Sequence, residues 1–444
     1  MKMNYPLTKK KLFFAATFAF LTLGFTANAQ ETGPVSNPTD TIYPIVEQAQ
    51  SDLAVLKRLK ITGYVQADYQ KADTAGIASF ADGNFGSGIN NRMLVRRGRV
   101  KFAYDNELSQ AVLQLDITEK GVGIKDAYLS LTEPWLKTLA VTGGVMDRPF
   151  GNEIAYSSSS LESPERSRII QTLFPGEKDL GGMISLQAPK TSPWNFIRLD
   201  AGYFDGNGAA VETDSKKDFI GHLFLGKASS SEKFKWGIGG SYYNGGFAQV
   251  TTNYYTMVKD ANGVEGYAKS TVTKGAIAKR QYVGVDAQLS LDWALGITQL
   301  RAEYLQGTQP GSSSSNASLT AAMVGDTYSR KFNGYYAYFI QNILQTPVQL
   351  VVKYDVYDPN TDVSGNNIGK AVVAGNVKTG AADVKYSTLG LGINYRWNSN
   401  VKIMAYYDMV TNETTSLITT PSTLTNLAKD RKDNVFTLRL QYKF

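Results

Sequence analysis

The sequence predicts an all-β fold: a membrane-spanning antiparallel β-barrel of about sixteen strands, closed on itself. The first observation is the C-terminal stretch 434–444, NVFTLRLQYKF, in which apolar and polar residues alternate and the apolar set ends on Phe444 itself. A period of two is typical of a strand, and chain ends in water usually fray. An apolar stripe that runs to the last residue fits a lipid-facing strand, whose backbone is paired only in a closed barrel.

The second observation lies at the N-terminus. Four lysines (Lys2, Lys9, Lys10 and Lys11) precede the apolar run 12–25, and Ala27-Asn28-Ala29 supplies a small-x-small cleavage pattern. We expect residues 1–29 to be a cleaved secretory signal peptide, because the apolar run is shorter than the ~20 residues of a membrane anchor. These lysines account for four of the net +7 charges, so the mature chain is only weakly basic and no nucleic-acid partner is indicated.

Residues 30–60 begin polar and then carry Ile45, Val46, Leu53, Leu56 and Leu59 at near-helical spacing. We expect a periplasmic segment with a short helix. It is too short for a folded plug, which argues against an energy-coupled transporter. No cysteine is present, so neither a lipoprotein nor a disulfide scaffold is expected.

From residue 61 to 444 the chain repeats alternating segments close to the ~10 residues that a tilted strand needs to cross a bilayer. The expected strands are 61–70, 93–104, 110–117, 124–132, 138–146, 181–188, 196–203, 218–227, 234–243, 281–291, 297–306, 332–341, 347–356, 384–394, 400–409 and 434–443. Loop 244–280 contains a further hairpin signal at Asn262-Gly263. Counted as spanning, it would give eighteen strands, but both faces of its first arm are polar, so we expect an extracellular hairpin.

Short and long connections alternate along the chain, apart from the short stretch 118–123. This is the arrangement of outer-membrane barrels, with short periplasmic turns and long extracellular loops. The long connections are 71–91, 148–180, 204–217, 244–280, 307–331, 357–383 and 410–433. We therefore expect the chain in the outer membrane of a Gram-negative bacterium, in contact with its lipid.

Loop 148–180 is the expected constriction. A barrel of this size leaves an aqueous lumen unless a segment folds inward. The loop exceeds thirty residues and carries its own apolar side chains, so it can pack inside the barrel. It also offers four cations: Arg148, Arg166, Arg168 and Lys178.

The densest basic run is 96–101, RRGRVK. With Leu94, Val100, Phe102 and Tyr104 on the lipid face, Arg97, Arg99 and Lys101 face the lumen about 6.7 Å apart. Such a ladder favours anions, although lumen walls are polar in any case and acids share the same register. Two other lumen-register cations complete the candidate anion-binding set: Arg198 and Lys353.

Several motifs resemble the phosphate-selective porin family (porins O and P). They are Asp126-Ala127-Tyr128, the stretch 143–151 (GGVMDRPFG), Glu165-Arg166-Ser167, the stretch 174–181 (FPGEKDLG) and Lys353-Tyr354-Asp355. The resemblance implies a trimeric, sixteen-stranded outer-membrane channel whose third long connection folds inward. The family usually has arginine where Lys178 stands, and its phosphate specificity depends on an arginine ladder, of which Arg97, Arg99 and Lys101 are the local counterpart.

We therefore predict a porin for passive diffusion of small hydrophilic solutes, with a preference for anions or phosphate, and no cofactor or metal. We expect a homotrimer and recognition of the C-terminal strand ending at Phe444 by the barrel assembly machinery. The alternatives are a barrel without a channel, serving as an adhesin or structural protein, and an outer-membrane hydrolase. A hydrolase would need His222, the single histidine, as its base, and no nucleophile is placed near it in the sequence.

Overall fold

The computed structural model describes residues 46–48, 50, 53, 56–418 and 426–444, in two units, 1–55 and 56–444. In the first unit the described residues are helical. The predicted signal peptide, 1–29, lies outside the described residues, as does most of the predicted periplasmic segment 30–60. Among the described residues, no helix is long and apolar enough to cross a membrane.

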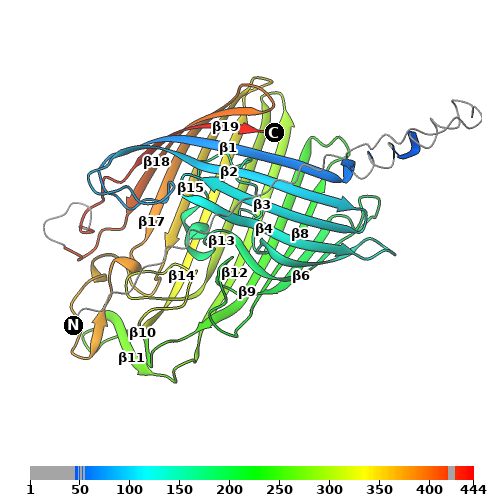
Figure 1. The fold of residues 1–444 in the computed structure, drawn as a ribbon. Coiled ribbons are helices and arrows are strands. Elements are labelled where there is room, and N and C mark those ends of the chain that lie inside the picture. Colours follow the sequence, from blue (N-terminus) through cyan, green and yellow to red (C-terminus); the bar gives the residue numbers. More distant parts are fainter. Residues whose placement is uncertain (1–45, 49, 51–52, 54–55, 419–425) are drawn as a thin grey trace, which may run out of the picture. The chain divides into compact units, whose positions relative to one another are not determined.

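The second unit is a closed antiparallel barrel of sixteen strands, as the sequence predicts (Figure 1). The barrel strands are β1 (Leu59–Ala72), β2 (Asn91–Asn106), β3 (Ser109–Thr118), β4 (Gly121–Thr132), β5 (Leu139–Asp147), β6 (Lys178–Gln187), β7 (Ile197–Phe204), β8 (Asp218–Ala228), β9 (Phe234–Ala248), β12 (Ile277–Trp293), β13 (Gly296–Gly311), β14 (Thr327–Asn342), β15 (Val348–Asp358), β17 (Tyr386–Arg396), β18 (Val401–Asn412) and β19 (Val435–Lys443).

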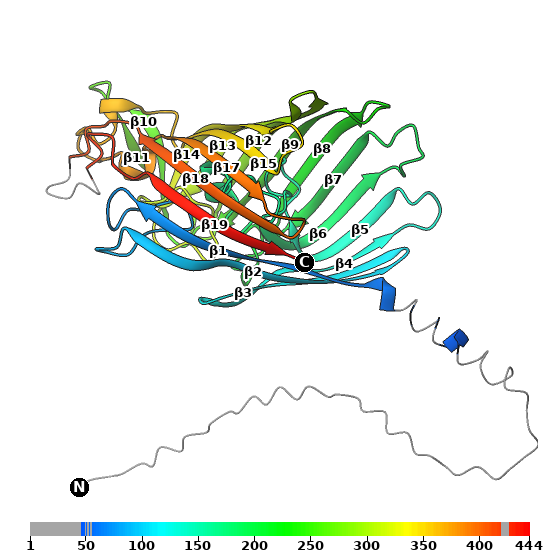
Figure 2. The same cartoon turned by 90° about the horizontal axis from the view of Figure 1, so that it is seen from above.

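The barrel closes between the first and last strands. β1 pairs with β2 on one side and with β19 on the other, where Tyr64 is opposite Lys443 and Ala72 is opposite Val435 (Figure 2). The backbone N–H of Phe444 donates to the carbonyl of Gly63 at 2.9 Å. The C-terminal alternation thus continues the wall, with Leu438, Leu440 and Tyr442 exposed on the outer face.

The hairpin at Asn262-Gly263 is not part of the barrel wall, so the eighteen-strand alternative is wrong. β9 pairs directly with β12, from Ala248 opposite Ile277 to Phe234 opposite Leu291. The hairpin strands β10 (Asn253–Lys259) and β11 (Glu265–Thr271) pair with each other beyond this ladder, and touch β14 and the short strand β16 (Asn376–Lys378). Two 3-10 turns, Gly365–Asn367 and Ala381–Asp383, lie with β16 in the loop between β15 and β17.

The largest buried apolar cluster lies inside the barrel, between loop 148–177 and the lumen face of the strands. From the loop it contains Phe150, Ile154, Ile169, Ile170, Leu173 and Phe174. From the wall it contains aromatic residues of β9, β12, β14, β15 and β18, including Tyr243, Tyr282, Phe332, Tyr336, Tyr338, Tyr357 and Tyr406. The loop is therefore held by a hydrophobic core of its own, because burial of this many apolar side chains is strongly favourable.

Candidate functional site: the inward loop and the open half of the lumen

Loop 148–177 connects β5 to β6 and contains the short helix α2 (Arg168–Leu173). The sequence predicts its end at residue 180, but Lys178 pairs in register with Asp147, so residues 178–180 belong to β6. Backbone hydrogen bonds to the end of β5 therefore extend β6 over residues 178–180, which the sequence predicts as part of the loop.

The start of the loop is fixed to the wall by Glu303 of β13. Its Oε2 accepts hydrogen bonds from the backbone N–H of Asn152 (3.2 Å) and from the hydroxyl of Tyr336 (2.7 Å). Gly151 approaches so closely that a Cβ there would overlap the carboxylate of Glu303, and its φ is +60°. Only glycine fits this approach without strain.

The middle of the loop follows the wall from β14 to β2. Tyr338 donates to Glu153, Asn394 to the carbonyl of Glu162, and Lys402 to the carbonyl of Leu161. Arg439 of β19 donates to the carbonyl of Pro164 at 2.7 Å. The loop therefore occupies the half of the lumen that lies against β12–β15, β17–β19, β1 and β2.

The opposite half of the lumen is open. A cavity of about 610 Å³ lies between the first residues of the loop and the strands β3–β8. Its polar lining includes Gln110, Tyr128, Ser130, Thr142, Asp147, Asn152, Ser185, Arg198, Asp200, His222 and Gln288. A cavity lined by hydroxyl, amide and charged groups holds water.

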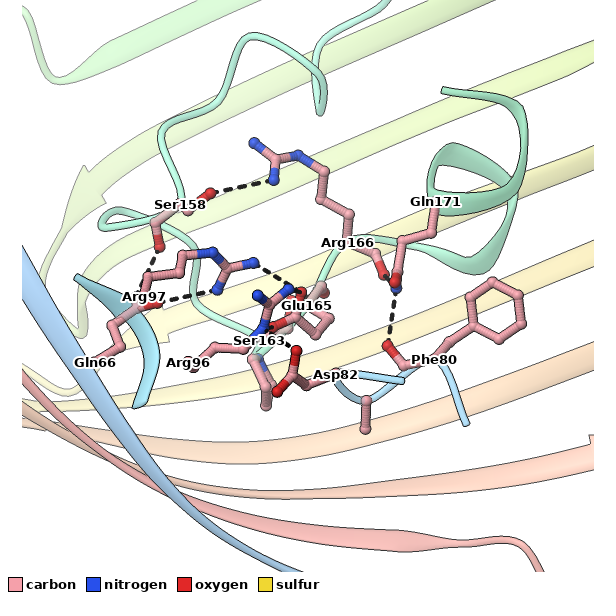
Figure 3. Close-up of polar contacts among 12 residues, drawn as sticks. Gln66, Phe80, Asp82, Arg96, Arg97, Ser158, Ser163, Glu165, Arg166 and Gln171 are labelled. Carbon is pink, nitrogen blue, oxygen red and sulfur yellow. Dashed lines mark hydrogen bonds and ion pairs between the residues drawn. The ribbon is translucent and has the colours of Figure 1, made fainter. Parts of the chain in front are cut away.

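Glu165 is the central acid of the loop (Figure 3). It accepts from Arg96 Nε at 2.6 Å, Arg97 Nη2 at 2.8 Å and Arg439 Nη2 at 3.3 Å. Burial by itself raises the pKa of the Glu165 carboxyl, but the guanidinium groups of Arg96 and Arg97 hold that pKa well below its usual value. The acid is thus ionised and neutralises the Arg97 end of the basic ladder.

Most of the nine predicted anion-binding residues are ion-paired. The pairs are Arg97–Glu165 (2.8 Å), Arg99–Asp116 (3.3 Å), Arg148–Asp179 (3.0 Å), Arg166–Glu177 (2.6 Å), Lys178–Asp126 (2.7 Å), Lys178–Asp147 (2.8 Å), Arg198–Asp200 (2.6 Å) and Lys353–Asp355 (3.4 Å). In the described part of the chain Lys101 makes no ion pair. The structure therefore does not bring the nine together as one site.

The three loop arginines hold the loop, and of the three only Arg148 also lines the open cavity. Arg166 donates to the carbonyls of Glu153 (2.8 Å) and Tyr156 (2.6 Å) as well as to Glu177. The Arg168 guanidinium lies 4.3 Å from the ring centroid of Phe80 and 4.1 Å from that of Tyr386, a cation–π arrangement. Arg148 is fully buried beside Phe174.

Two β-bulges place basic side chains in the lumen that strict alternation does not predict. In β2 the register with β1 shifts opposite Gln66, so Arg96 and Arg97 both face inward. The shift also corrects Leu94, predicted on the lipid face: Met93 and Val95 are the exposed residues there. A bulge inserts one extra residue and reverses the alternation beyond it.

The second bulge is in β4, where Gln114 pairs with Asp126 and Leu115 with Ile124. The intervening Lys125 joins Asp126 on the inner side, where Glu177, Arg99 and Asp116 are its electrostatic neighbours. Arg99 and Lys101 of β2 and Lys125 of β4 form a cationic row on the inner side of the wall. The exposed apolar residues change phase between Ile124 and Leu129, and this shift in the alternation is the sequence signal of the bulge.

Comparison with known proteins gives one family and several solved barrels. The family model described as "Phosphate-selective porin O and P" matches residues 59–444. Similar solved structures include an anion-selective porin from Comamonas acidovorans (12% identity, 87% of this chain and 99% of that chain, TM-score 0.49) and the channel DcaP of Acinetobacter baumannii (12%, 87% and 97%, 0.49). The trimer form of OmpT of Vibrio cholerae is another (10%, 87% and 99%, 0.49). No curated protein matches.

Proposed function

Because the chain belongs to the phosphate-selective porin O and P family, and is thus an outer-membrane porin, we propose that it conducts small hydrophilic solutes with a preference for anions. The family and the fold favour a channel over an enzyme. The observation that supports this proposal best is the half-filled lumen. Loop 148–177 covers one wall and leaves the water-accessible cavity of about 610 Å³ against the other.

The anion preference is assigned to the cationic row Arg99, Lys101 and Lys125, not to the whole predicted ladder. Arg97 is neutralised by Glu165, and the loop arginines are structural. Arg99 is paired with Asp116 at 3.3 Å, while the two lysines make no ion pair within the described residues. Cationic side chains on a pore wall lower the barrier to anions.

Reversal potentials in a planar bilayer under a salt gradient test this assignment. The double variant Lys101→Ser/Lys125→Ser should lower the chloride-to-potassium permeability ratio severalfold, because it removes the two unpaired cations of the row. Lys227→Ser, on the outer face near a short turn, is the matched control and should leave the ratio unchanged. An unchanged ratio in the double variant would refute the proposal.

Chloride and phosphate should be compared in the same channel. Binding of phosphate would appear as a conductance that saturates with phosphate concentration and as inhibition of the chloride current by added phosphate. A phosphate conductance that rises linearly with concentration, without inhibition, would instead indicate a general anion channel.

We further propose a homotrimer that is exported through the signal peptide 1–29 and inserted into lipid by the barrel assembly machinery. The outer face of β2–β5 supports self-association, since Ala111, Ala127 and Gly143 form the floor of an apolar groove of about 510 Å³. Sedimentation of the detergent-solubilised protein would show the trimer; a monomer at micromolar concentration would exclude it.

One geometric observation bears on the hydrolase alternative. His222 Nε2 lies 2.9 Å from Asp286 Oδ2, and Ser241 pairs with His222 in register. The Ser241 hydroxyl, however, accepts the backbone N–H of Gly151 at 2.8 Å, and no hydrogen bond joins it to His222 within the described residues. Substitution of His222 by Ala should leave a conducting channel, and ester hydrolysis by the preparation should be the same in the wild type and the variant.

A further inference from the structure

The outer face of four neighbouring strands changes character at one level. On β9, β12, β13 and β14 the outward residues are apolar or aromatic up to Tyr242, Val283, Tyr304 and Tyr335, all of which are exposed. Exposed aromatic side chains at the end of an apolar band mark a membrane–water interface. These strand ends lead into the long loops, so this is the outer-leaflet boundary of the barrel.

The next outward residue on each of the four strands carries a side-chain amide: Asn244, Gln281, Gln306 and Asn333. They are neighbours across the sheet, because Gln281 is opposite Asn244 and Gln306 is opposite Asn333. Gln281 donates to Asn244 at 2.9 Å, and Tyr304 donates to Gln306 at 3.1 Å. We call these four residues the amide row.

Two lysines lie on the same outer face, two residues further along the strands towards the long loops. Lys279 precedes Gln281 by two residues on β12, and Lys331 precedes Asn333 by two on β14, so both lie on the same face of the sheet. Lys331 contacts Asp362 at 3.3 Å with both side chains solvent-accessible, which is a weak, solvent-screened pair. Lys279 makes no ion pair within the described residues. Beside the loops, the boundary therefore carries net positive charge.

The surface next to Lys331 is concave, and Asn244 and Lys279 lie beside this groove rather than in its lining. A groove of about 460 Å³ is lined by Tyr242, Gln281, Val283, Gln306, Thr308, Lys331, Asn333 and Thr361. Gly307 contributes to its floor. The groove thus joins the top of the apolar band to amide, hydroxyl and ammonium groups.

From this arrangement we propose that the groove binds the headgroup of a phosphorylated glycolipid of the outer leaflet. Its acyl chains would lie along the apolar band below. Side-chain amides and the Thr308 hydroxyl suit the hydroxyl groups of a sugar, since each can donate and accept. The ammonium groups of Lys279 and Lys331 suit a phosphate, and charge complementarity selects this occupant over a neutral lipid.

Native mass spectrometry of the detergent-solubilised full chain tests the proposal. The probes are bisphosphorylated lipid A, the same lipid after dephosphorylation, and phosphatidylethanolamine. Wild-type protein should retain bisphosphorylated lipid A in preference to both others. The variant Lys279→Gln/Lys331→Gln should weaken that retention by about thirtyfold, given roughly 1 kcal/mol for each lysine near a charged lipid surface.

A second variant, Gln281→Leu/Gln306→Leu, should weaken retention of both forms of lipid A, because it removes sugar contacts and keeps the charge. The matched control is Lys227→Gln, a lysine on the outer face at the opposite rim, which should bind as wild type does. Heat-dependent gel mobility and channel conductance, both expected to be unchanged, show that each variant is folded.

Equal retention of bisphosphorylated lipid A by the wild type and the lysine variant would overturn the proposal. Equal retention of bisphosphorylated and dephosphorylated lipid A by the wild-type protein would also overturn it. A change of oligomeric state in the amide variant, with lipid binding unaltered, would assign this face to a second copy of the chain and would equally refute it.

Discussion

At the scale of single residues, charge pairing decides which cations can act on a passing ion. Glu165 contacts arginines from β2 and β19, two strands that flank β1, and so joins the loop to the barrel at its closing point. Removing one partner of a buried charge cluster leaves uncompensated charge and typically costs about 3–5 kcal/mol. Glu165 therefore controls both the position of the loop and the electrostatic potential of the pore.

The substitution Glu165→Gln should raise conductance and anion preference together. Without the carboxylate, Arg97 is no longer neutralised, while Arg96 keeps its ion pair with Asp82 at 2.8 Å, and the loop loses its attachment to β2. Single-channel recording and reversal potentials measure both effects. Glu232→Gln, an exposed acid in a short turn, is the control; wild-type values in both assays for Glu165→Gln would contradict this view of the loop.

Low pH should release the C-terminal end of loop 148–177. Burial raises the pKa of Glu177, but the charges of Arg166, Lys125, Arg99 and Arg97 together outweigh burial and lower that pKa from 4.5 to about 2. Because the folded value is the lower one, the contribution of roughly 3 kcal/mol is complete above pH 4.5 and is lost as the pH falls towards 2.

Conductance should accordingly be constant from about pH 7 to 5 and become noisy or larger as the pH falls below about 3. The variant Glu177→Gln should show that behaviour already at neutral pH and lose part of the acid response. If the wild type and Glu177→Gln give superimposable pH profiles, Glu177 does not hold the loop.

At the scale of elements, loop 148–177 is a packed structure with two kinds of anchor. Its apolar residues form the main buried cluster with the lumen face, and Glu303 fixes its first turn through backbone N–H groups. Hydrogen bonds to buried groups are expensive to leave unmade, so the first turn is held in one place.

Gly151→Ala should displace this turn and change the bore. The added methyl would collide with the Glu303 carboxylate, and the φ of +60° disfavours alanine. Gly176→Ala is a matched control in the same loop: its φ is +74°, but no atom lies within 4 Å of where the methyl would be. Conductance should change in the first variant and stay near wild type in the second. The same conductance in both would mean that Glu303 does not position the loop.

At the scale of the whole molecule, stability depends on closure between β1 and β19. A Cβ at Gly63 would lie 2.5 Å from both the carbonyl oxygen of Arg99 and the ring of Phe444. The terminal aromatic therefore packs over a glycine at the seam, and overpacking such a contact typically costs about 1–3 kcal/mol.

Gly63→Ala should lower the temperature at which the folded band converts to the unfolded band on a gel. Gly240→Ala, where the added methyl group would meet no atom within 4 Å, should leave that temperature unchanged. Equal shifts in the two variants would show that the seam is no more sensitive than any other strand.

Residue pattern alone was enough to predict the strand number, the alternation of short and long connections, and the apolar side chains that hold the inward loop. These features follow from local periodicity and chain length, which each strand carries in its own sequence. Strict alternation could not place Arg96 and Lys125 in the lumen, because each lies at a bulge, where the alternation of apolar and polar residues changes phase.

The filled half of the lumen and the set of neutralised cations, by contrast, depend on the folded barrel. Arg439 and Glu165 are 274 residues apart in the chain, yet they share an ion pair. Such pairs form only once the loop has packed inside the closed wall. Position within that wall, rather than residue type, therefore separates the structural arginines from the row Arg99, Lys101 and Lys125.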